Sequence, residues 1–266
     1  ESYDQELRDL LKKLSVFAHS FSVADAEHIQ RVTDSDPRMV VTALGFFVRE
    51  GILTQDDELF MFRYDLFKKA LYTSLLNFNK KILHRVIAEL MIEKGQPHPM
   101  RLLHHLFRAE EYDRAADTLM ESPHVTGNVE YLRYVDRLLE HVGEHDFDRS
   151  MRLMFVKSAI LFNNGITEEA DSLLKGMIEM AIRKLSPLYA GSAYHLLTAY
   201  NMKAYCFGKA AYCGAKSVAY YRRAGTGTYN LQNVLEIMAS SELLRNNQTE
   251  VRSEERRVGK ECATGC

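Results

Sequence analysis

The chain has 266 residues, of which 46% are hydrophobic and 26% are charged, and its formal net charge is −2. This length suffices for one large or two modest domains with a buried core, and the near-neutral charge argues against the strong basic excess of a nucleic-acid-binding protein. Thr42 and Gly45 interrupt the apolar run from Met39 to Val48, and no run reaches the roughly 18 residues of a membrane-spanning helix, so we expect no membrane partner.

The first sixty residues predict three helices and a small β-hairpin. Apolar residues recur at helical spacing over 5–19, Ser22 can cap a second helix that runs to about Val32, and Pro37 suits the first turn of a third helix over 37–50. After Gly51 the pattern predicts two short strands, 52–54 and 59–62, joined by the polar turn 55–58. This is the layout of a winged helix, which we assign to residues 1–63.

From Tyr64 onward the pattern predicts helices and no further strand. Glycines and prolines separate these helices by short joins, and paired helices with short joins indicate an α-solenoid. The predicted fold is therefore mainly α, with linking helices over 64–97 and tetratricopeptide-like repeats over 98–251. The expected helices run over 65–76, 78–94, 99–107, 110–122, 128–142, 147–163, 167–184, 188–203, 205–223 and 229–246.

A weak internal repeat supports the solenoid. The segments 112–115, 167–170 and 207–210 each open a helix and carry alanine as their fourth residue. They resemble the second helix of a tetratricopeptide repeat, in which a small alanine lets two helix backbones approach closely. The interval of 40 residues between Ala170 and Ala210 exceeds the usual repeat length of about 34, and the chain has no tryptophan, so we describe the repeats as tetratricopeptide-like.

The junction between the wing and the first linking helix is expected to act as a rigid elbow. The second strand can place aromatic rings on one face, and the helix that follows carries an apolar stripe with a tyrosine beside it. A shared core would then join the winged helix to the solenoid. The residues expected to pack at this elbow are Phe60, Phe62, Arg63, Leu66, Phe67, Tyr72 and Leu75.

The segment FMFRYDLFKKALYTSLLNFNKKILHRVIAELM, residues 60–91, resembles a segment of bacterial signalling ATPases of the STAND type. These include predicted ATPases fused to nucleotide cyclases or protein kinases, and maltose-activator-like transcription regulators. The family pattern reads roughly Phe-x-Phe-Arg-His-x-Leu, then Tyr-x-x-Leu, then Leu-His-Arg, and Tyr64 replaces its first histidine here. The matching residues are Phe60, Phe62, Arg63, Leu66, Tyr72, Leu75, Leu83, His84 and Arg85.

The resemblance implies a winged helix and repeats that follow a nucleotide-binding domain, and we expect the sequence, which begins at Glu1, to be a fragment without that domain. The nearest approach to a phosphate-binding loop is the segment 208–217, which has the wrong spacing and no preceding strand. His141 and His145 flank Gly143 and are read as loop histidines rather than metal ligands. We therefore expect no enzyme activity, no cofactor and no metal in this fragment.

Tyrosines concentrate in the second half of the chain, with eight of the fourteen between Tyr189 and Tyr229. In solenoids of this type, asparagine amides can hold a peptide backbone and tyrosines can line a concave groove. The alternative reading is that these tyrosines pack between helices with their hydroxyls in water. The candidate groove residues are Asn163, Tyr194, Asn201, Tyr205 and Tyr212.

Three readings of the function remain. The first is a cytoplasmic, non-catalytic arm of a signalling ATPase that binds a protein, peptide or inducer and relays it to the absent domain. The second is a stand-alone peptide-binding scaffold. The third is a DNA-binding regulator, for which the third helix offers only Arg38 and Arg49 and the wing turn is acidic.

Two further features concern the cysteines and the end of the chain. Cys206 and Cys213 are two helical turns apart, about 10 Å, too far to form a disulfide, and unpaired thiols fit a reducing cytoplasm. The segment RSEERRVGKEC within 252–266 resembles a translated DNA-sequencing adapter, so we treat 252–266 as a non-native tail. The alternative is a natural solvated charged tail.

Overall fold

A computed structural model describes residues 2–95, 98–122, 125–143, 145–225, 232–240, 243, 244 and 246. The chain divides into two compact units, the N-terminal unit Glu1–Ser122 and the C-terminal unit Pro123–Cys266. The domain boundaries expected at residues 63 and 97 stay predictions, and the expected tail over 252–266 lies outside the described residues.

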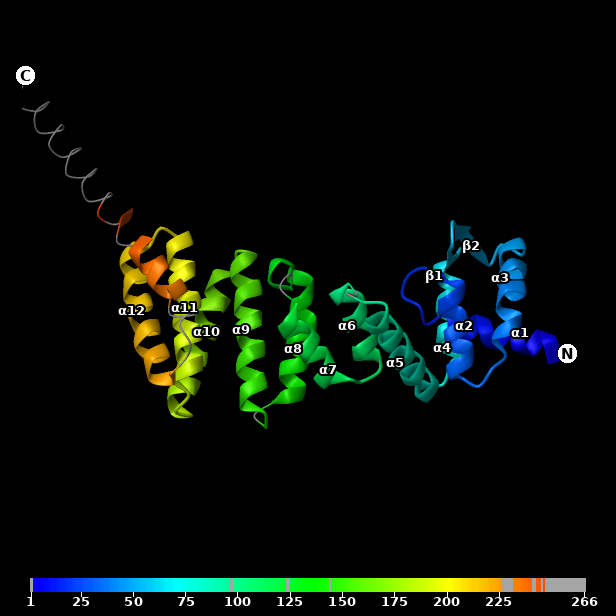
Figure 1. The fold of residues 1–266 in the computed structure, drawn as a ribbon, viewed down its shortest axis with the longest axis horizontal. Coiled ribbons are helices and arrows are strands. Elements are labelled where there is room, and N and C mark those ends of the chain that lie inside the picture. The colour runs from blue at the N-terminus through cyan, green and yellow to red at the C-terminus, as the bar shows by residue number, and fades with distance from the viewer. Residues whose placement is uncertain are drawn as a thin grey trace, which may run out of the picture. The chain divides into compact units, whose positions relative to one another are not determined.

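The N-terminal unit begins with helices and strands in the order of a winged helix (Figure 1). The sheet is antiparallel with strand order β1-β3-β2, so the third strand in sequence lies in the middle. Phe60 pairs with both Phe21 and Gln55. The elements are α1 (Ser2–Leu14), β1 (Phe21–Ser22), α2 (Val23–Val32), the 3-10 helix η1 (Pro37–Met39), α3 (Val40–Arg49), β2 (Leu53–Asp56) and β3 (Leu59–Phe62).

Local sequence explains most of these boundaries. The Ser22 side chain accepts a hydrogen bond from the backbone of Asp25, whose carboxylate accepts one from the Ser22 backbone, so a capping box starts α2. Asp36 caps η1, with Pro37 at its first position. Gly51 takes a left-handed φ of 71°, which ends the run after α3 and lets the chain enter β2.

One hydrophobic cluster holds the winged-helix part and α5 together. Phe21, Phe47, Phe60 and Phe62 are buried in it with aliphatic residues from α1, α2, α3 and β2. Burying one such ring stabilises the fold by about 1.5–3 kcal/mol. The remaining helices of the unit are α4 (Asp65–Ser74), α5 (Asn77–Glu93), α6 (Pro99–Arg108) and α7 (Tyr112–Glu121).

The C-terminal unit is a stack of helix pairs, and Figure 1 shows α9 to α12 side by side in chain order. The helices α9 to α12 begin every 20 residues, and Ala170, Ala190 and Ala210, each the fourth residue of its helix, are 0% exposed. The elements are η2 (Val125–Gly127), η3 (Val129–Tyr131), α8 (Leu132–Val142), α9 (Phe147–Asn163), α10 (Thr167–Arg183), α11 (Pro187–Lys203) and α12 (Phe207–Ala224), and residues 232–240 are also helical.

The joints between these helices share one geometry. Gly165, Leu185 and Tyr205 each have a left-handed φ, between 53° and 78°. The backbone N–H of the following residue then donates to the carbonyl five positions back, at 2.8–2.9 Å. This is the Schellman ending, in which a left-handed residue lets the chain satisfy the last carbonyls of a helix.

The predicted fold class is confirmed, because the structure is mainly α, with a small sheet near the N-terminus followed by stacked helix pairs. Over the described residues no strand follows Tyr64. Two details differ from the prediction. The sheet has a third strand, β1, and the helix expected over 37–50 begins with the 3-10 turn η1 before α3.

Candidate functional site

The C-terminal unit carries a groove formed by α10, α11 and α12, with a volume of about 630 Å³. Its size falls in the usual range for ligand sites, about 300–1,000 Å³. Apolar, aromatic and charged side chains contribute to it together. The lining residues are Thr167, Glu168, Asp171, Lys175, Ile178, Glu179, Tyr194, Leu197, Tyr200, Asn201, Lys209, Tyr212 and Cys213.

Tyrosines form the aromatic part of the groove. Tyr194 is half-buried and stacks on Tyr220, with ring centroids 5.7 Å apart. Tyr200 also lines the groove and stacks on Phe162, with ring centroids 4.0 Å apart. The Tyr212 side chain is 60% exposed, so it can take part in binding without first leaving a packed position.

The charged part of the groove is mixed in sign. The Lys175 ammonium lies 2.6 Å from an Asp171 carboxylate oxygen one turn earlier on α10. Glu168 and Glu179 add two carboxylates, and Lys209 on α12 adds a second ammonium. The groove therefore offers apolar area with a few convergent polar groups, the combination that fixes the orientation of a peptide or small ligand.

Three of the five expected groove residues line this groove, namely Tyr194, Asn201 and Tyr212. Asn201 is buried, and its amide donates to the Leu197 carbonyl at 2.7 Å, so one of its two donors is used within its own helix. Asn163 lies elsewhere, with its amide donating to the Thr126 carbonyl at 3.1 Å.

Tyr205 does not line the groove, because it is the left-handed residue at the joint between α11 and α12. Its side chain is 76% exposed. Helical spacing with Tyr212 suggested a shared face, but the chain is not helical at this position. Tyr200 is the groove tyrosine that spacing missed, although it lies six residues after Tyr194 on the same helix.

The expected elbow residues divide into two groups. Phe60 and Phe62 are 6% and 9% exposed, and Leu71, Tyr72 and Leu75 pack against the same cluster from α4 and its end. The cluster also includes apolar residues of α5, so wing, α4 and α5 share one core.

Leu66 and Phe67 lie on the outer side of α4, with side chains 81% and 42% exposed. The helix begins at Asp65 and turns its inner face toward positions 68, 71, 72 and 75, about one residue later than the sequence pattern indicated. Lys68 lies on this inner side, where its ammonium donates to the Ala18 carbonyl at 3.3 Å. Arg63 is exposed, and its backbone N–H donates to the Ile52 carbonyl at 3.0 Å.

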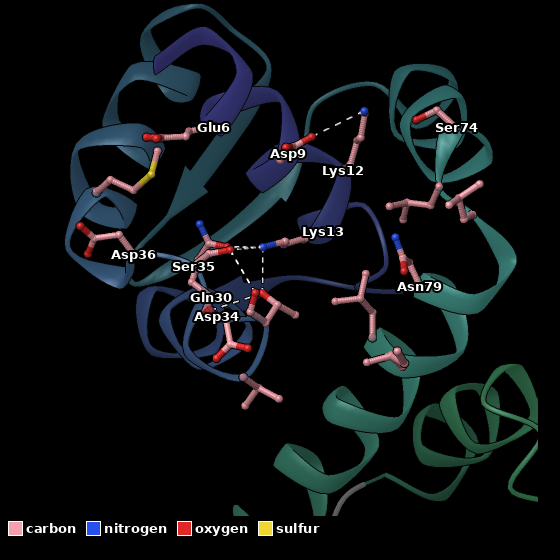
Figure 2. A pocket seen from close by; sticks show the side chains of 17 residues that line it. Glu6, Asp9, Lys12, Lys13, Gln30, Asp34, Ser35, Asp36, Ser74 and Asn79 are labelled. Atoms are coloured by element: carbon pink, nitrogen blue, oxygen red, sulfur yellow. Dashed lines mark hydrogen bonds and ion pairs between the residues drawn. The ribbon is translucent and has the colours of Figure 1, made fainter. Parts of the chain in front are cut away.

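A second hollow, of about 800 Å³, lies within the N-terminal unit. Figure 2 shows polar side chains of α1 and of the turn after α2 on one side, and the α4–α5 corner on the other. Carboxylates outnumber ammonium groups on the polar wall, and the α4–α5 wall is largely aliphatic. The lining residues are Glu6, Asp9, Lys12, Lys13, Gln30, Val32, Thr33, Asp34, Ser35, Asp36, Met39, Ser74, Leu75, Leu76, Asn79, Ile82 and Leu83.

Lys13 fixes the polar wall of this hollow. Its ammonium donates to the side-chain oxygens of Gln30, Thr33 and Ser35 at 2.7–2.8 Å, as the dashed lines in Figure 2 show. Burial lowers the pKa of Lys13, while nearby Asp9 opposes that shift. Because all three donors of its ammonium group bind neutral acceptors, Lys13 stabilises the wall and has no donor left for an incoming anion.

Neither hollow shows a metal centre. Among the residues the structure describes, no group of three histidine, cysteine or acidic side chains could hold a metal ion. In the same residues no helix is both long and apolar enough to cross a bilayer. Cys206 is exposed and Cys213 is buried in the groove wall, and both are free thiols.

No protein-family model matches the sequence, and a search of curated proteins finds no match. The fold is similar to the crystal structure of a Signal Transduction ATPase with Numerous Domains (STAND) protein with a tetratricopeptide repeat sensor from Pyrococcus horikoshii, at 18% sequence identity and a TM-score of 0.57. The match covers 92% of this chain and 36% of that chain, so the chain spans about a third of that protein. At this identity the likeness concerns the fold alone.

Proposed function

We propose that this chain is the sensor arm of a multidomain signalling ATPase, and that it binds a protein or peptide in the α10–α12 groove. The observation that carries the proposal is the groove itself, which Tyr194, Tyr200 and Tyr212 line together with apolar and charged groups. The fold-level likeness to a STAND protein with a tetratricopeptide repeat sensor supports the same reading. The arm has no catalytic role of its own in this proposal.

Binding would reach the nucleotide-binding domain through the elbow. Wing, α4 and α5 share one core, because Phe60 and Phe62 pack in the same cluster as Leu83, Val86 and Ile87. Closely packed elements move as rigid bodies rather than deforming smoothly. A displacement of α5 would therefore carry the winged-helix part with it.

A peptide-display selection on the intact chain tests the groove. Peptides enriched on the wild-type chain are expected to lose at least about tenfold in affinity on Tyr212→Ala, because removing an aromatic anchor from an interface costs about 1–3 kcal/mol. Tyr205→Ala is the matched control, since Tyr205 is an exposed tyrosine outside the groove. Equal binding to both variants would contradict the proposed site.

The hollow of about 800 Å³ in the N-terminal unit is a candidate site for a small inducer. Glu6 and Asp34 line it opposite aliphatic side chains of the α4–α5 corner, whereas Asp9 and Asp36 are paired with Lys12 and Arg38. Two carboxylates facing an aliphatic wall suit a cationic group on an apolar chain. Spermidine is a suitable probe. Its binding, measured by calorimetry, is expected to weaken in the double variant Glu6→Gln and Asp34→Asn.

The DNA-binding alternative is disfavoured by the surface of the winged helix. Arg38 is ion-paired with Asp36 at 2.9 Å, and Val41 on α3 is 60% exposed. The wing turn adds Asp56 and Asp57, which would repel phosphates. We expect no retardation of a DNA duplex in a mobility-shift assay at low salt.

A further inference from the structure

Three ring side chains, those of half-buried Tyr72 and buried His84 and His105, form a hydrogen-bonded chain that connects α4, α5 and α6. The Tyr72 hydroxyl lies 3.1 Å from Nε2 of His84, and Nδ1 of His84 lies 2.9 Å from Nδ1 of His105. His84 and His105 are 1% and 2% exposed. None of these three residues lines the α10–α12 groove or the hollow of the N-terminal unit, so the buried histidines need a separate explanation.

The contact between the two Nδ1 atoms restricts the number of protons that the rings can carry. One Nδ1 must donate a hydrogen and the other must accept it, and a histidine cation carries a hydrogen on both ring nitrogens. Two cations would therefore place two hydrogens against each other in a gap of 2.9 Å. The chain accommodates two neutral rings or a single cation, and it excludes two cations.

The charged groups that face the rings oppose even the single cation. The acidic residues next to the end of α6 do not compensate, because Glu110 is ion-paired with Lys81 and Glu111 with Arg85. Burial, reinforced by neighbouring histidines and cations, lowers the pKa of His84 to about 2 and that of His105 to about 3. The titratable and charged groups that face the three hydrogen-bonded rings are Lys68 on α4, Lys80 on α5, His104 and Arg108 on α6, and His19 in the loop after α1.

We propose that the Tyr72–His84–His105 chain is an acid-opened latch, which holds α4, α5 and α6 together while both rings are neutral and releases them when both rings take up protons. The latch joins the elbow helices α4 and α5 to α6, and it does not depend on what the α10–α12 groove binds. It gives this region a response to acidification that the groove cannot supply.

The size of the response follows from proton linkage. In the closed state both rings stay neutral above about pH 5, whereas in the opened state each titrates near the usual histidine pKa of about 6.5. When folding lowers the pKa of a histidine, the folded state loses stability relative to the opened state as the pH falls below the pKa of the opened state. Between pH 7.5 and pH 5.5 the open-to-closed ratio is expected to rise about tenfold per ring, or about 100-fold for both.

Amide hydrogen exchange of the intact chain at pH 7.5 and pH 5.5, corrected for the intrinsic exchange rate, measures this ratio. The open fraction of 65–108 is expected to rise about 100-fold relative to peptides of α9 and α10. At pH 5.5 these residues should also exchange before α1. A rise below tenfold, or exchange of α1 at the same rate as 65–108, would overturn the latch.

Variants separate the proton count from the strength of the hydrogen bonds. His105→Gln leaves one titrating ring, so the pH effect is expected to fall from about 100-fold to about tenfold, and His84→Gln has the same expectation should the first variant fail to fold. Tyr72→Phe removes one hydrogen bond and should raise the open fraction at both pH values with the 100-fold ratio retained. His145→Gln, at an exposed position, is the matched control and should leave the ratio unchanged. A 100-fold ratio in His105→Gln would refute the proposal.

Discussion

The N-terminal and C-terminal units bury their side chains in different ways. The N-terminal unit gathers strands and helices that are far apart in sequence around one cluster rich in phenylalanine. The C-terminal unit instead packs each helix on the next, with small residues buried between helices, as at Ala170, Ala190 and Gly191, which lies against the Tyr221 ring. Loss of one buried side chain of the shared core should therefore weaken the sheet and the helices together, whereas a stack of neighbours should lose stability joint by joint.

The largest expected effect tests whether the N-terminal core is shared. Phe60→Ala should lower the free energy of unfolding by about 3–5 kcal/mol, because it removes a buried ring that touches both the sheet and the helices. Urea unfolding followed by circular dichroism measures the loss. The matched control Leu66→Ala, at a side chain 81% exposed, should change stability by less than about 0.5 kcal/mol. Similar losses in both variants would show that Phe60 lies in no shared core.

The next largest expected effect is a loss of stability on acidification that is greater in the N-terminal unit than in the C-terminal unit. The low pKa values of His84 and His105 mean that the N-terminal unit loses up to about 1.4 kcal/mol per pH unit for each ring as the pH falls below about 6.5. In the C-terminal unit His195 also has a pKa lowered by burial, but it is a single ring. Amide-exchange protection of α3 should therefore fall more steeply than that of α11 between pH 6.5 and pH 5. Parallel declines would remove this difference between the units.

A smaller effect tests the close approach of α11 and α12. Gly191→Ala would place its new Cβ 2.8 Å from Cδ1 of Tyr221, and such overpacking costs about 1–3 kcal/mol. Gly176→Ala is the matched control in α10, where a Cβ meets nothing within 4 Å, and it should stabilise the helix by roughly 0.5–1 kcal/mol. Thermal unfolding should move in opposite directions for the two variants. Stabilisation by both would mean that α11 and α12 are not in close contact here.

The smallest expected effect concerns an ion-pair bridge across three helices of the stack. The Lys157 ammonium on α9 lies 2.9 Å from Asp136 on α8 and 3.3 Å from Glu169 on α10. Lys157→Met keeps most of the packing and should cost about 0.5–1 kcal/mol at low salt. The loss should shrink in about 1 M sodium chloride, since salt screens such pairs. A loss independent of salt would assign the effect to packing instead.

Local sequence signals predict the helices and their ends well. The features that were not predicted, strand β1 and the buried face of α4, depend on contacts with residues far along the chain. Strand β1 is only Phe21–Ser22 and exists because Phe21 and Ser22 pair with Phe60 and Leu59, far along the chain. The inner face of α4 differs from its apolar pattern because Tyr72 reaches His84 on the next helix. The periodicity of a single segment carries no information about either of these two contacts.

The same distinction applies to the groove. Tyr194, Asn201 and Tyr212 could be found from the sequence, since helical spacing alone places each on its helix. Tyr205 could not, because a left-handed backbone at a non-glycine residue carries no reliable sequence signal. The regular spacing of Ala170, Ala190 and Ala210 is also present in the sequence, although the predicted repeat rests only on the first and last of these alanines.

The constant joint between α9, α10, α11 and α12 has a consequence for how such a chain can grow. Each joint closes one helix through its own backbone and needs nothing from the next helix to do so. Duplicating one helix pair in the gene would therefore reproduce a complete module, with its corners already formed. Related proteins could vary the length of this arm in whole modules while keeping the buried alanines in register.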